Sequence, residues 1–178
     1  MSAGVRVRRA VTGALTSLGP ESGITRSIVR RTCAQRGVNC TFHSQFVSLI
    51  RAGNEIRLPL EQVMFAPYVS SYFETFAGSV EGVQTDTGRL VDFSEPRLHH
   101  YVQLDAEFEL PSFPEAIDFD DEYFRHGAPA PGSLVFDLGA NVGLVSHALS
   151  RAVGPTGRVF AFEPDPTSLE YLRRNNTR

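Results

Sequence analysis

The spacing of apolar residues predicts helices in the first part of the chain and leaves one stretch undecided. Apolar positions recur at helical spacing in residues 7–18, more weakly in residues 25–35, and again in residues 60–76, where Pro67 interrupts them. Residues 38–58 fit a strand and a helix about equally. We expect the aromatic stripe of the third helical stretch to lie in the core. This stripe consists of Met64, Tyr68, Tyr72 and Phe76.

The middle of the chain shows the shorter period that is typical of β-strands. Residues 82–85 and 89–93 flank the turn tripeptide Asp86-Thr87-Gly88, which predicts a β-hairpin. Apolar residues alternate with acids in residues 101–110, which predicts one further strand with a solvated acidic face. Residues 105–122 hold eight acids and no base, and we interpret them as a solvated surface and not as a metal site.

The last part of the chain predicts a strand, a turn, a helix and a second strand. Residues 133–136 are a short, continuously apolar run, as expected of a parallel strand buried on both faces. Helical spacing follows and ends at Gly154, and a second buried strand is predicted for residues 158–162. Asp165 and Pro166 then predict the capped start of another helix. This is a right-handed crossover unit, in which ligands bind at the carboxyl ends of the strands.

These elements predict an α/β fold with a Rossmann-like parallel sheet, of which only the first two core strands are present. We divide the chain into a basic, helical N-terminal region (1–57), an α+β region (58–132) and the first part of a cofactor-binding domain (133–178). The first region carries a net charge of +7, and the rest of the chain carries −10. We expect the basic region to pack on the acidic remainder, and we expect no nucleic-acid partner.

The composition excludes several classes of protein. The chain has 178 residues, of which 42% are hydrophobic, as in an ordinary globular protein. No apolar run reaches the roughly 18 residues of a membrane span, and no signal peptide opens the chain, so we expect no transmembrane segment and a cytoplasmic location. The spacing of Cys33 and Cys40 supports neither a disulfide framework nor a zinc site.

The turn after the first strand of the crossover unit separates two classes of cofactor. A dinucleotide site needs closely spaced glycines for a pyrophosphate, but Asn141 stands where the middle glycine would be, between Gly139 and Gly143. Asp137 beside the turn would repel a pyrophosphate. S-adenosylmethionine (SAM) carries an ammonium and a sulfonium and no phosphate, so an acidic strand end favours it. Glu163 ends the second strand, where a carboxylate can accept both ribose hydroxyls of either cofactor.

The segment from Asp137 to Gly143, followed by Gly157-Arg-Val-Phe-Ala-Phe-Glu163-Pro-Asp-Pro166, resembles FkbM-type class I SAM-dependent methyltransferases. The resemblance is strong over residues 121–178 and weaker over residues 68–96. It implies that the chain stops before five further strands of the family's domain, and hence that it is C-terminally truncated and holds the cofactor-binding half. Members of this kind are similar to O-methyltransferases, so the implied acceptor is a hydroxyl group on a small molecule or a sugar.

Carried over by position, the resemblance implies a set of cofactor-binding residues. Asp137 would hold the methionyl end of SAM and Glu163 the ribose, while Gly139 and Gly143 permit a close turn and Asn141 lines it. The remaining implied residues are Phe162 and Pro164 beside the adenine, and Glu122 and Tyr123 at the border of the pocket.

The sequence alone does not allow us to assign a general base. His147 falls within a predicted helix, where we interpret it as a surface residue. Two other hypotheses stay open at this point: a NAD-binding oxidoreductase fragment, and a non-catalytic remnant or interaction subunit. A sheet of only two core strands would also leave an open edge, which predicts self-association.

Overall fold

The computed structural model describes residues 19–117 and 123–177. The helix expected in residues 7–18 and the candidate site residue Glu122 lie outside this part of the chain. None of the helices within it has the length and apolar character needed to cross a membrane.

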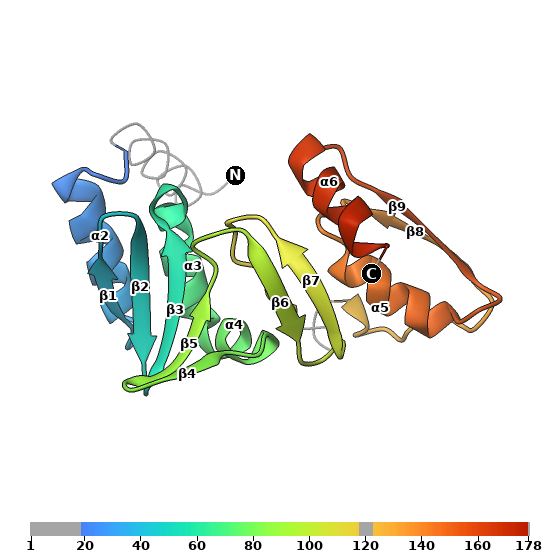
Figure 1. The fold of residues 1–178 in the computed structure, drawn as a ribbon, viewed down its shortest axis with the longest axis horizontal. Helices are drawn as coiled ribbons and strands as arrows, with labels where there is room; N and C mark the ends of the chain where they lie inside the picture. Colours follow the sequence, from blue (N-terminus) through green and yellow to red (C-terminus); the bar gives the residue numbers. More distant parts are fainter. Residues whose placement is uncertain (1–18, 118–122, 178) are drawn as a thin grey trace. The chain divides into compact units, whose positions relative to one another are not determined.

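The first of two compact units comprises residues 19–73 and 83–94 and contains a five-stranded sheet (Figure 1). Its strand order is β1-β2-β3-β5-β4, in which β3 and β5 are parallel and all other neighbours are antiparallel. The strands are β1 (Asn39–Phe42), β2 (Phe46–Arg51), β3 (Asn54–Pro59), β4 (Val83–Thr85) and β5 (Gly88–Asp92).

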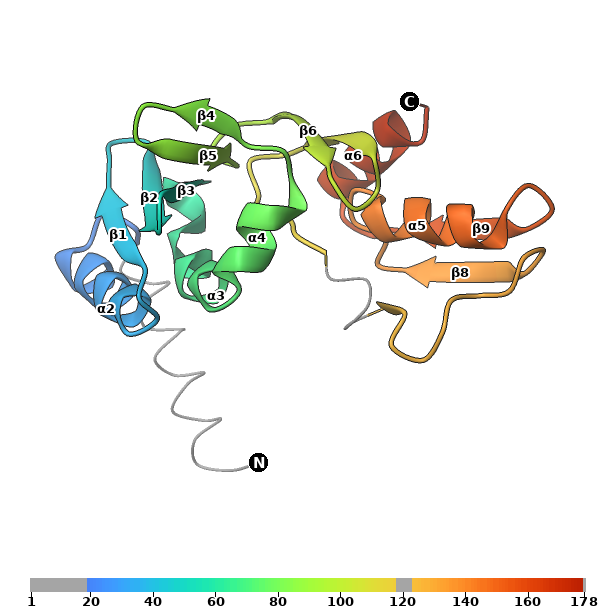
Figure 2. The same cartoon turned by 90° about the horizontal axis from the view of Figure 1, so that it is seen from below.

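Helices cover one face of this sheet and enclose the core of the first unit. They are α2 (Gly23–Ala34), the 3-10 helix η1 (Leu60–Phe65) and α3 (Ala66–Ser71). Figure 2 shows α2 and α3 on the same side of the sheet. Because side chains alternate along a strand, alternate residues face these helices, and six of them are at most 6% exposed. These buried residues are Cys40, Val47, Leu49, Ile56, Leu58 and Val91.

The first unit confirms two predictions and corrects two others. The helix near residues 25–35 and the hairpin around residue 86 are present as α2 and β4–β5. The prediction of a helical region up to residue 57 was wrong, because α2 ends at Ala34 and strands occupy residues 39–59. Apolar residues in this undecided stretch follow the period of two once the turn at Gly53 is placed.

The aromatic stripe of residues 60–76 is only partly buried, contrary to expectation. Tyr68 and Tyr72 are each 53% exposed, whereas Phe76 is 4% exposed. The reason is a break in the helix: Tyr72 caps α3 with a non-helical backbone conformation, so the helical spacing of α3 does not continue into α4 (Phe73–Ser79). Pro67 does not interrupt the helix but stands in the first turn of α3, where its missing N–H is tolerated.

The second unit begins with α4 and continues with a hairpin where one strand was expected. The hairpin consists of β6 (Arg97–Tyr101) and β7 (Ala106–Leu110), which pair antiparallel. The prediction of one strand over residues 101–110 was wrong because a turn separates β6 from β7. Asp105 closes this turn with a left-handed φ of 48°, and the alternation of apolar residues continued through the turn by chance.

The crossover unit of residues 133–178 has the predicted elements. These are β8 (Leu134–Leu138), α5 (Leu144–Val153), β9 (Arg158–Phe162) and α6 (Pro166–Asn175). β8 and β9 are parallel, with Asp137 opposite Ala161, and the Asp165 carboxylate caps α6 by accepting a hydrogen bond from the Ser168 N–H at 2.8 Å. The structure is thus of the α/β type with parallel strand pairing, and the Rossmann-like assignment stays a prediction.

The two strands of the crossover unit are half-buried on one face and exposed on the other, which corrects the expectation of burial on both. Val135 and Val159 lie on the face of α5, whereas the large apolar residues of the opposite face are between 41% and 77% exposed. We call this opposite face the bare face of β8–β9. It consists of Leu134, Phe136, Leu138, Phe160 and Phe162.

The β6–β7 hairpin packs against the helices of the crossover unit. Phe108 contacts the His147 ring edge to face at a centroid distance of 5.4 Å, and Arg151 donates a hydrogen bond to the Leu104 carbonyl at 2.5 Å. The side-chain amide of Asn175 bonds both backbone groups of Glu109 and the carbonyl of Val142. The hairpin is therefore tied to α5 and to α6, and α6 is tied to the loop between β8 and α5.

Candidate functional site

The loop between β8 and α5 is a tight turn built from left-handed residues. Gly139, Asn141 and Gly143 have φ values of 86°, 48° and 99°. A Cβ atom at Gly143 would lie 2.7 Å from Leu172 Cδ1. Both the left-handed backbone at this position and the close approach of Leu172 therefore favour glycine. A Cβ atom at Gly139 would meet nothing within 4 Å. Gly139 therefore borders open space, and Gly143 holds the loop against α6.

Asp137 lies on the α5 side of the sheet, one residue before the end of β8. Its Oδ2 accepts a hydrogen bond from the Ser146 hydroxyl at 2.5 Å, and Ser146 is 5% exposed. The carboxylate thus joins β8 to α5, and its position is fixed by a buried partner.

Glu163 follows β9 directly and binds the loop of the neighbouring strand. Its Oε2 accepts the N–H of Asn141 at 2.8 Å, and its Oε1 accepts the N–H of Asp165 at 2.8 Å. The carbonyl of Phe162 accepts the N–H groups of Gly139 and Ala140 at 2.8 and 3.0 Å. The end of β9 therefore supports the glycine turn through both the backbone and the Glu163 carboxylate.

A cavity of about 150 Å³ lies beside the glycine turn. Its lining includes Gly139 and Asn141 of the turn, Tyr123, and the carboxylate-bearing Glu115. Glu115 Oε2 accepts a hydrogen bond from the Asn141 side-chain amide at 2.8 Å. Neither Asp137 nor Glu163 is among the described residues that line the cavity. The acidic side chain that borders it is Glu115, which the sequence did not single out.

Glu115 is held in place by the buried Tyr101. The Tyr101 hydroxyl donates a hydrogen bond to the Glu115 carbonyl at 2.9 Å, and Tyr101 is 2% exposed. Burial and the nearby Glu115 charge raise the pKa of Tyr101 well above its ordinary value, so the phenol stays protonated and donates. No local pattern in the sequence indicates this role, because Glu115 stands among the acids of residues 105–122, which we interpret as a solvated surface.

The other predicted site residues lie around the turn with different exposure. Tyr123 lines the cavity and is 51% exposed. Phe162 is 50% exposed and belongs to the bare face, where Phe136 stacks against it at 6.2 Å. Pro164 is exposed after the end of β9. The turn thus brings together Tyr123, Gly139 and Asn141 at one cavity, and Phe162 points to the bare face of β8–β9.

His147 is half-buried in α5 against Phe108, and it is not a plain surface residue as expected. Burial and the charge of Arg151 lower the pKa of His147 below its ordinary value, so the ring is neutral at neutral pH. No histidine of the described residues lines the cavity beside the turn.

Two known proteins share sequence with part of this chain. Over 47 residues, 26% of this chain, it is 47% identical to protein-L-isoaspartate O-methyltransferase from Aeropyrum pernix, of which it covers 18%. Over 57 residues, 32% of this chain, it is 42% identical to 31-O-demethyl-FK506 methyltransferase FkbM from Streptomyces tacrolimicus, of which it covers 22%. Part of this chain is therefore similar to methyltransferases.

The similarity covers a limited share of the proteins involved. The chain spans about a fifth of the length of the curated relatives that it matches. No protein-family model matches the chain, and no solved structure matches it.

Proposed function

We propose that this chain binds SAM beside the glycine turn of residues 139–143 and serves the methylation of a hydroxyl group on a small molecule or a sugar. The observation that carries the proposal is the set of carboxylates around this turn: Asp137 and Glu163 at the strand ends and Glu115 at the cavity. The similarity to two methyltransferases supports it independently. When bound, SAM would supply a methyl group on a positively charged sulfur.

The residues around the turn fit one end of such a cofactor. The cavity of about 150 Å³ is smaller than the roughly 300–1,000 Å³ of a complete small-molecule site, and we assign it to the methionyl end of SAM. Glu115 lines it and offers a carboxylate to the ammonium group, and open space beside Gly139 admits the ligand close to the backbone. We therefore assign the contact with the ammonium group to Glu115. Asp137, which the resemblance assigns to the same methionyl end of SAM, would support the site by holding β8 against α5 through Ser146.

The other assignments follow the order of residues along the edge of the sheet. Glu163 would accept the ribose hydroxyls, after exchanging one of its bonds to the N–H of Asn141 or Asp165. Phe162 and Pro164 would flank the adenine, Gly143 and Asn141 shape the turn, and Tyr123 borders the pocket. The resemblance adds Glu122 beside Tyr123.

Charge distinguishes this proposal from binding of NAD. A pyrophosphate at the turn would meet the carboxylate of Glu115, because this residue lines the cavity. Like charges in a partly buried site are repelled more strongly than in water. A cofactor with a cationic end and no phosphate avoids this repulsion.

Titration calorimetry of the purified chain with SAM, S-adenosylhomocysteine and NADH tests the proposal. We expect heat of binding with the first two ligands and none with NADH. Binding of NADH in preference to SAM would refute the charge argument. Absence of binding by all three ligands, in a chain shown to be folded by circular dichroism, would refute the cofactor site and favour an interaction subunit.

A variant of Glu163 sharpens this test. We expect Glu163→Ala to weaken SAM binding by about 1.5–3 kcal/mol, the value of lost charge-assisted hydrogen bonds. Glu107→Ala is the matched control, because Glu107 is an exposed acid of β7 away from the turn. Unchanged affinity of a folded Glu163→Ala chain would remove this residue from the site.

A second variant separates the role of Glu115 from that of Glu163. Glu115→Gln removes the charge at the methionyl end, so we expect it to weaken SAM and S-adenosylhomocysteine but not 5′-methylthioadenosine, which lacks the ammonium and carboxylate. Equal loss for all three ligands would assign Glu115 to the support of the turn through Asn141.

A further inference from the structure

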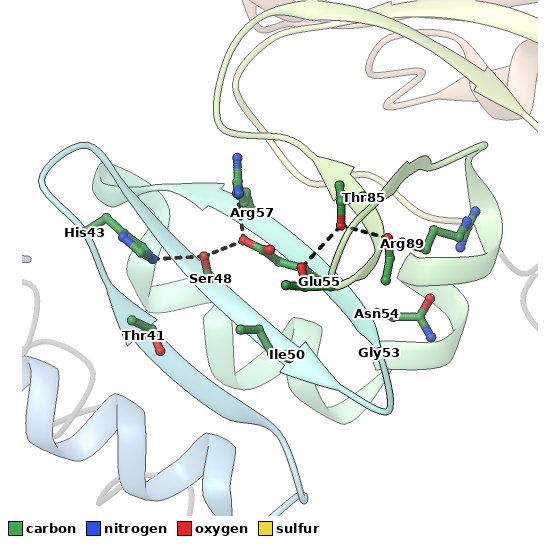
Figure 3. A pocket seen from close by; sticks show the side chains of 12 residues that line it. Thr41, His43, Ser48, Ile50, Gly53, Asn54, Glu55, Arg57, Thr85 and Arg89 are labelled. Atoms are coloured by element: carbon green, nitrogen blue, oxygen red, sulfur yellow. Dashed lines mark hydrogen bonds and ion pairs between the residues drawn. The ribbon is translucent and has the colours of Figure 1, made fainter.

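A second cavity lies in the first unit, on the sheet face opposite α2 and α3. Its volume is about 320 Å³, at the lower end of the range of roughly 300–1,000 Å³ for small-molecule sites. Figure 3 shows its lining, which comes from β1, β2, β3 and the β4–β5 turn. We call this cavity the sheet groove.

A chain of polar side chains crosses the floor of the sheet groove. The Ser48 hydroxyl donates a hydrogen bond to Glu55 Oε1 at 2.7 Å, and Arg57 Nε donates to the same oxygen at 2.7 Å (Figure 3). The His43 Nε2 lies 3.2 Å from the Ser48 oxygen. Ser48 is 1% exposed, so this network is built into the sheet and is not a chance surface contact.

The network fixes a carboxylate together with a partner of opposite charge. Burial raises the pKa of Glu55, but the bonds from Arg57 and Ser48 and the charges of Arg57 and His43 outweigh it and hold this pKa below its ordinary value. The carboxylate is therefore ionised at neutral pH. Within the described part of the chain, the hydrogen bonds to Glu55 go to Oε1, so Oε2 is left to accept from a ligand.

The arrangement of Ser48 and His43 is not that of a hydrolase. A nucleophilic serine gives its proton to the histidine, which a carboxylate orients. Here the serine proton points to Glu55, and the carboxylate bonds the serine and not the histidine. The hydroxyl is also almost completely buried. The groove thus offers fixed polar groups for binding and no activated nucleophile.

One wall of the sheet groove depends on a single glycine. A Cβ atom at Gly88 would lie 1.8 Å from the Gly53 carbonyl oxygen, and the Arg89 N–H donates to that oxygen at 2.8 Å. The β4–β5 turn is thereby seated directly on the β2–β3 turn. This contact brings Thr85 to the edge of the cavity opposite Thr41 (Figure 3), and Thr87 also lines the cavity.

Two of the charges that line the sheet groove compensate each other, because Arg57 Nε lies 2.7 Å from Glu55 Oε1. Such a pair attracts an ionic ligand of either sign less than a single charge would. Uncharged hydroxyl and amide groups make up much of the remaining lining, together with the half-exposed side chain of Ile50. These uncharged groups are those of Thr41, Asn54, Thr85 and Thr87.

We propose that the sheet groove binds a neutral, hydroxyl-rich small molecule of the size of a monosaccharide. Each hydroxyl of such a ligand both donates and accepts, so it matches a carboxylate oxygen beside guanidinium N–H groups and threonine hydroxyls. Its aliphatic ring face would contact Ile50. This site is separate from the proposed cofactor site, because none of its lining residues belongs to the second unit.

Nuclear magnetic resonance of the ¹⁵N-labelled full chain tests the proposal with three probes: methyl α-D-glucopyranoside, methyl β-D-galactopyranoside and methyl α-D-mannopyranoside. We expect at least one probe to shift the amide signals of Thr41, Ser48, Glu55 and Thr87, with a Kd in the millimolar range, about 1–10 mM. Glu55→Gln should raise this Kd about tenfold, as expected for loss of a charge-assisted hydrogen bond.

Two further variants keep the test decisive. Thr41→Val keeps the shape of the side chain and removes one hydroxyl, so it should raise the Kd about threefold even if Glu55→Gln does not fold. Glu61→Gln, an exposed acid of η1, should change nothing. The proposal is refuted if none of the three glycosides shifts the groove signals, or if citrate or inorganic phosphate shifts them more strongly.

Discussion

The two sheets of this chain are covered in opposite ways. In the five-stranded sheet, the apolar residues of β2 and β3 face α2 and α3, and the other face carries Ser48, Glu55 and Arg57. In the β8–β9 sheet, α5 covers one face, and the opposite face is apolar and exposed. A strand in which apolar and polar residues alternate is typical of a sheet that packs against other elements on one face only. Strands with apolar residues on both faces are typical of a parallel sheet that is covered on both faces. Among the described residues, the first sheet thus has a cover on its apolar face, and the second has a cover on one of its two apolar faces.

Two leucines in equivalent strand positions give the largest contrast. Leu58 in β3 is 0% exposed, and Leu138 in β8 is 77% exposed. We expect Leu58→Ala to lower the free energy of unfolding by about 2–5 kcal/mol, through lost burial and the cavity left behind. Leu138→Ala should change it by less than about 0.5 kcal/mol. Urea unfolding of dilute, monomeric protein, followed by circular dichroism, measures both values, and similar losses would mean that the bare face is covered within the monomer.

Two turn glycines give the next largest contrast. Gly88→Ala would place a Cβ against the Gly53 carbonyl, so we expect it to lower the free energy of unfolding by about 2 kcal/mol. Gly139→Ala meets no atom within 4 Å and costs only the left-handed backbone, about 1 kcal/mol, but should impair SAM binding by filling the approach to the turn. Thermal unfolding and calorimetry of both chains check this. An equal loss of stability would contradict the contact described at Gly88.

The bare face of β8–β9 predicts self-association of the chain. Exposed apolar patches of this kind associate, and no further strand within the described part of the chain pairs with the edges of this two-stranded sheet. Leu138→Ser should weaken dimer formation about tenfold, or about 1.4 kcal/mol, as measured by sedimentation equilibrium. Tyr68→Ser is the control, because Tyr68 is an exposed residue of the first unit. A wild-type chain that is monomeric at all concentrations would contradict this prediction.

The smallest contrast concerns the starts of two helices. The Asp165 side chain bonds the Ser168 N–H at the start of α6, whereas Ser22 makes no side-chain cap bond at the start of α2. We therefore expect Asp165→Ala to cost about 1 kcal/mol of unfolding free energy and Ser22→Ala much less. Differential scanning calorimetry of the two variants measures the difference. A larger effect at Ser22 would show that its hydroxyl caps α2 in solution.

The sequence allowed correct prediction where the signals are local. The turn at Gly154, the cap at Asp165 and the hairpin around residue 86 depend on the conformational preferences of a few adjacent residues. The strand predicted over residues 101–110 failed because its turn contains the apolar Val102 and depends on a left-handed Asp105, which alternation does not reveal.

The candidate site was predictable only in the part that lies within the crossover unit. Asp137, Gly139, Asn141, Gly143 and Glu163 lie at one edge of the sheet because β8 and β9 are parallel and in register. Glu115 belongs to a segment that reaches the turn only through tertiary contacts, above all the bond from the buried Tyr101. Such a contact between distant parts of the chain leaves no spacing or composition signal in a single sequence.

The side-chain amide of Asn175 has a consequence for the chemical ageing of the purified protein. It donates to the carbonyls of Glu109 and Val142 at 3.1 and 2.9 Å and accepts the Glu109 N–H at 2.8 Å. Hydrolysis of this amide would convert its donor into a carboxylate oxygen that faces two carbonyl oxygens. A single deamidation at this residue during storage, detected as a mass gain, would then loosen α6 from the β6–β7 hairpin and from the loop at Val142.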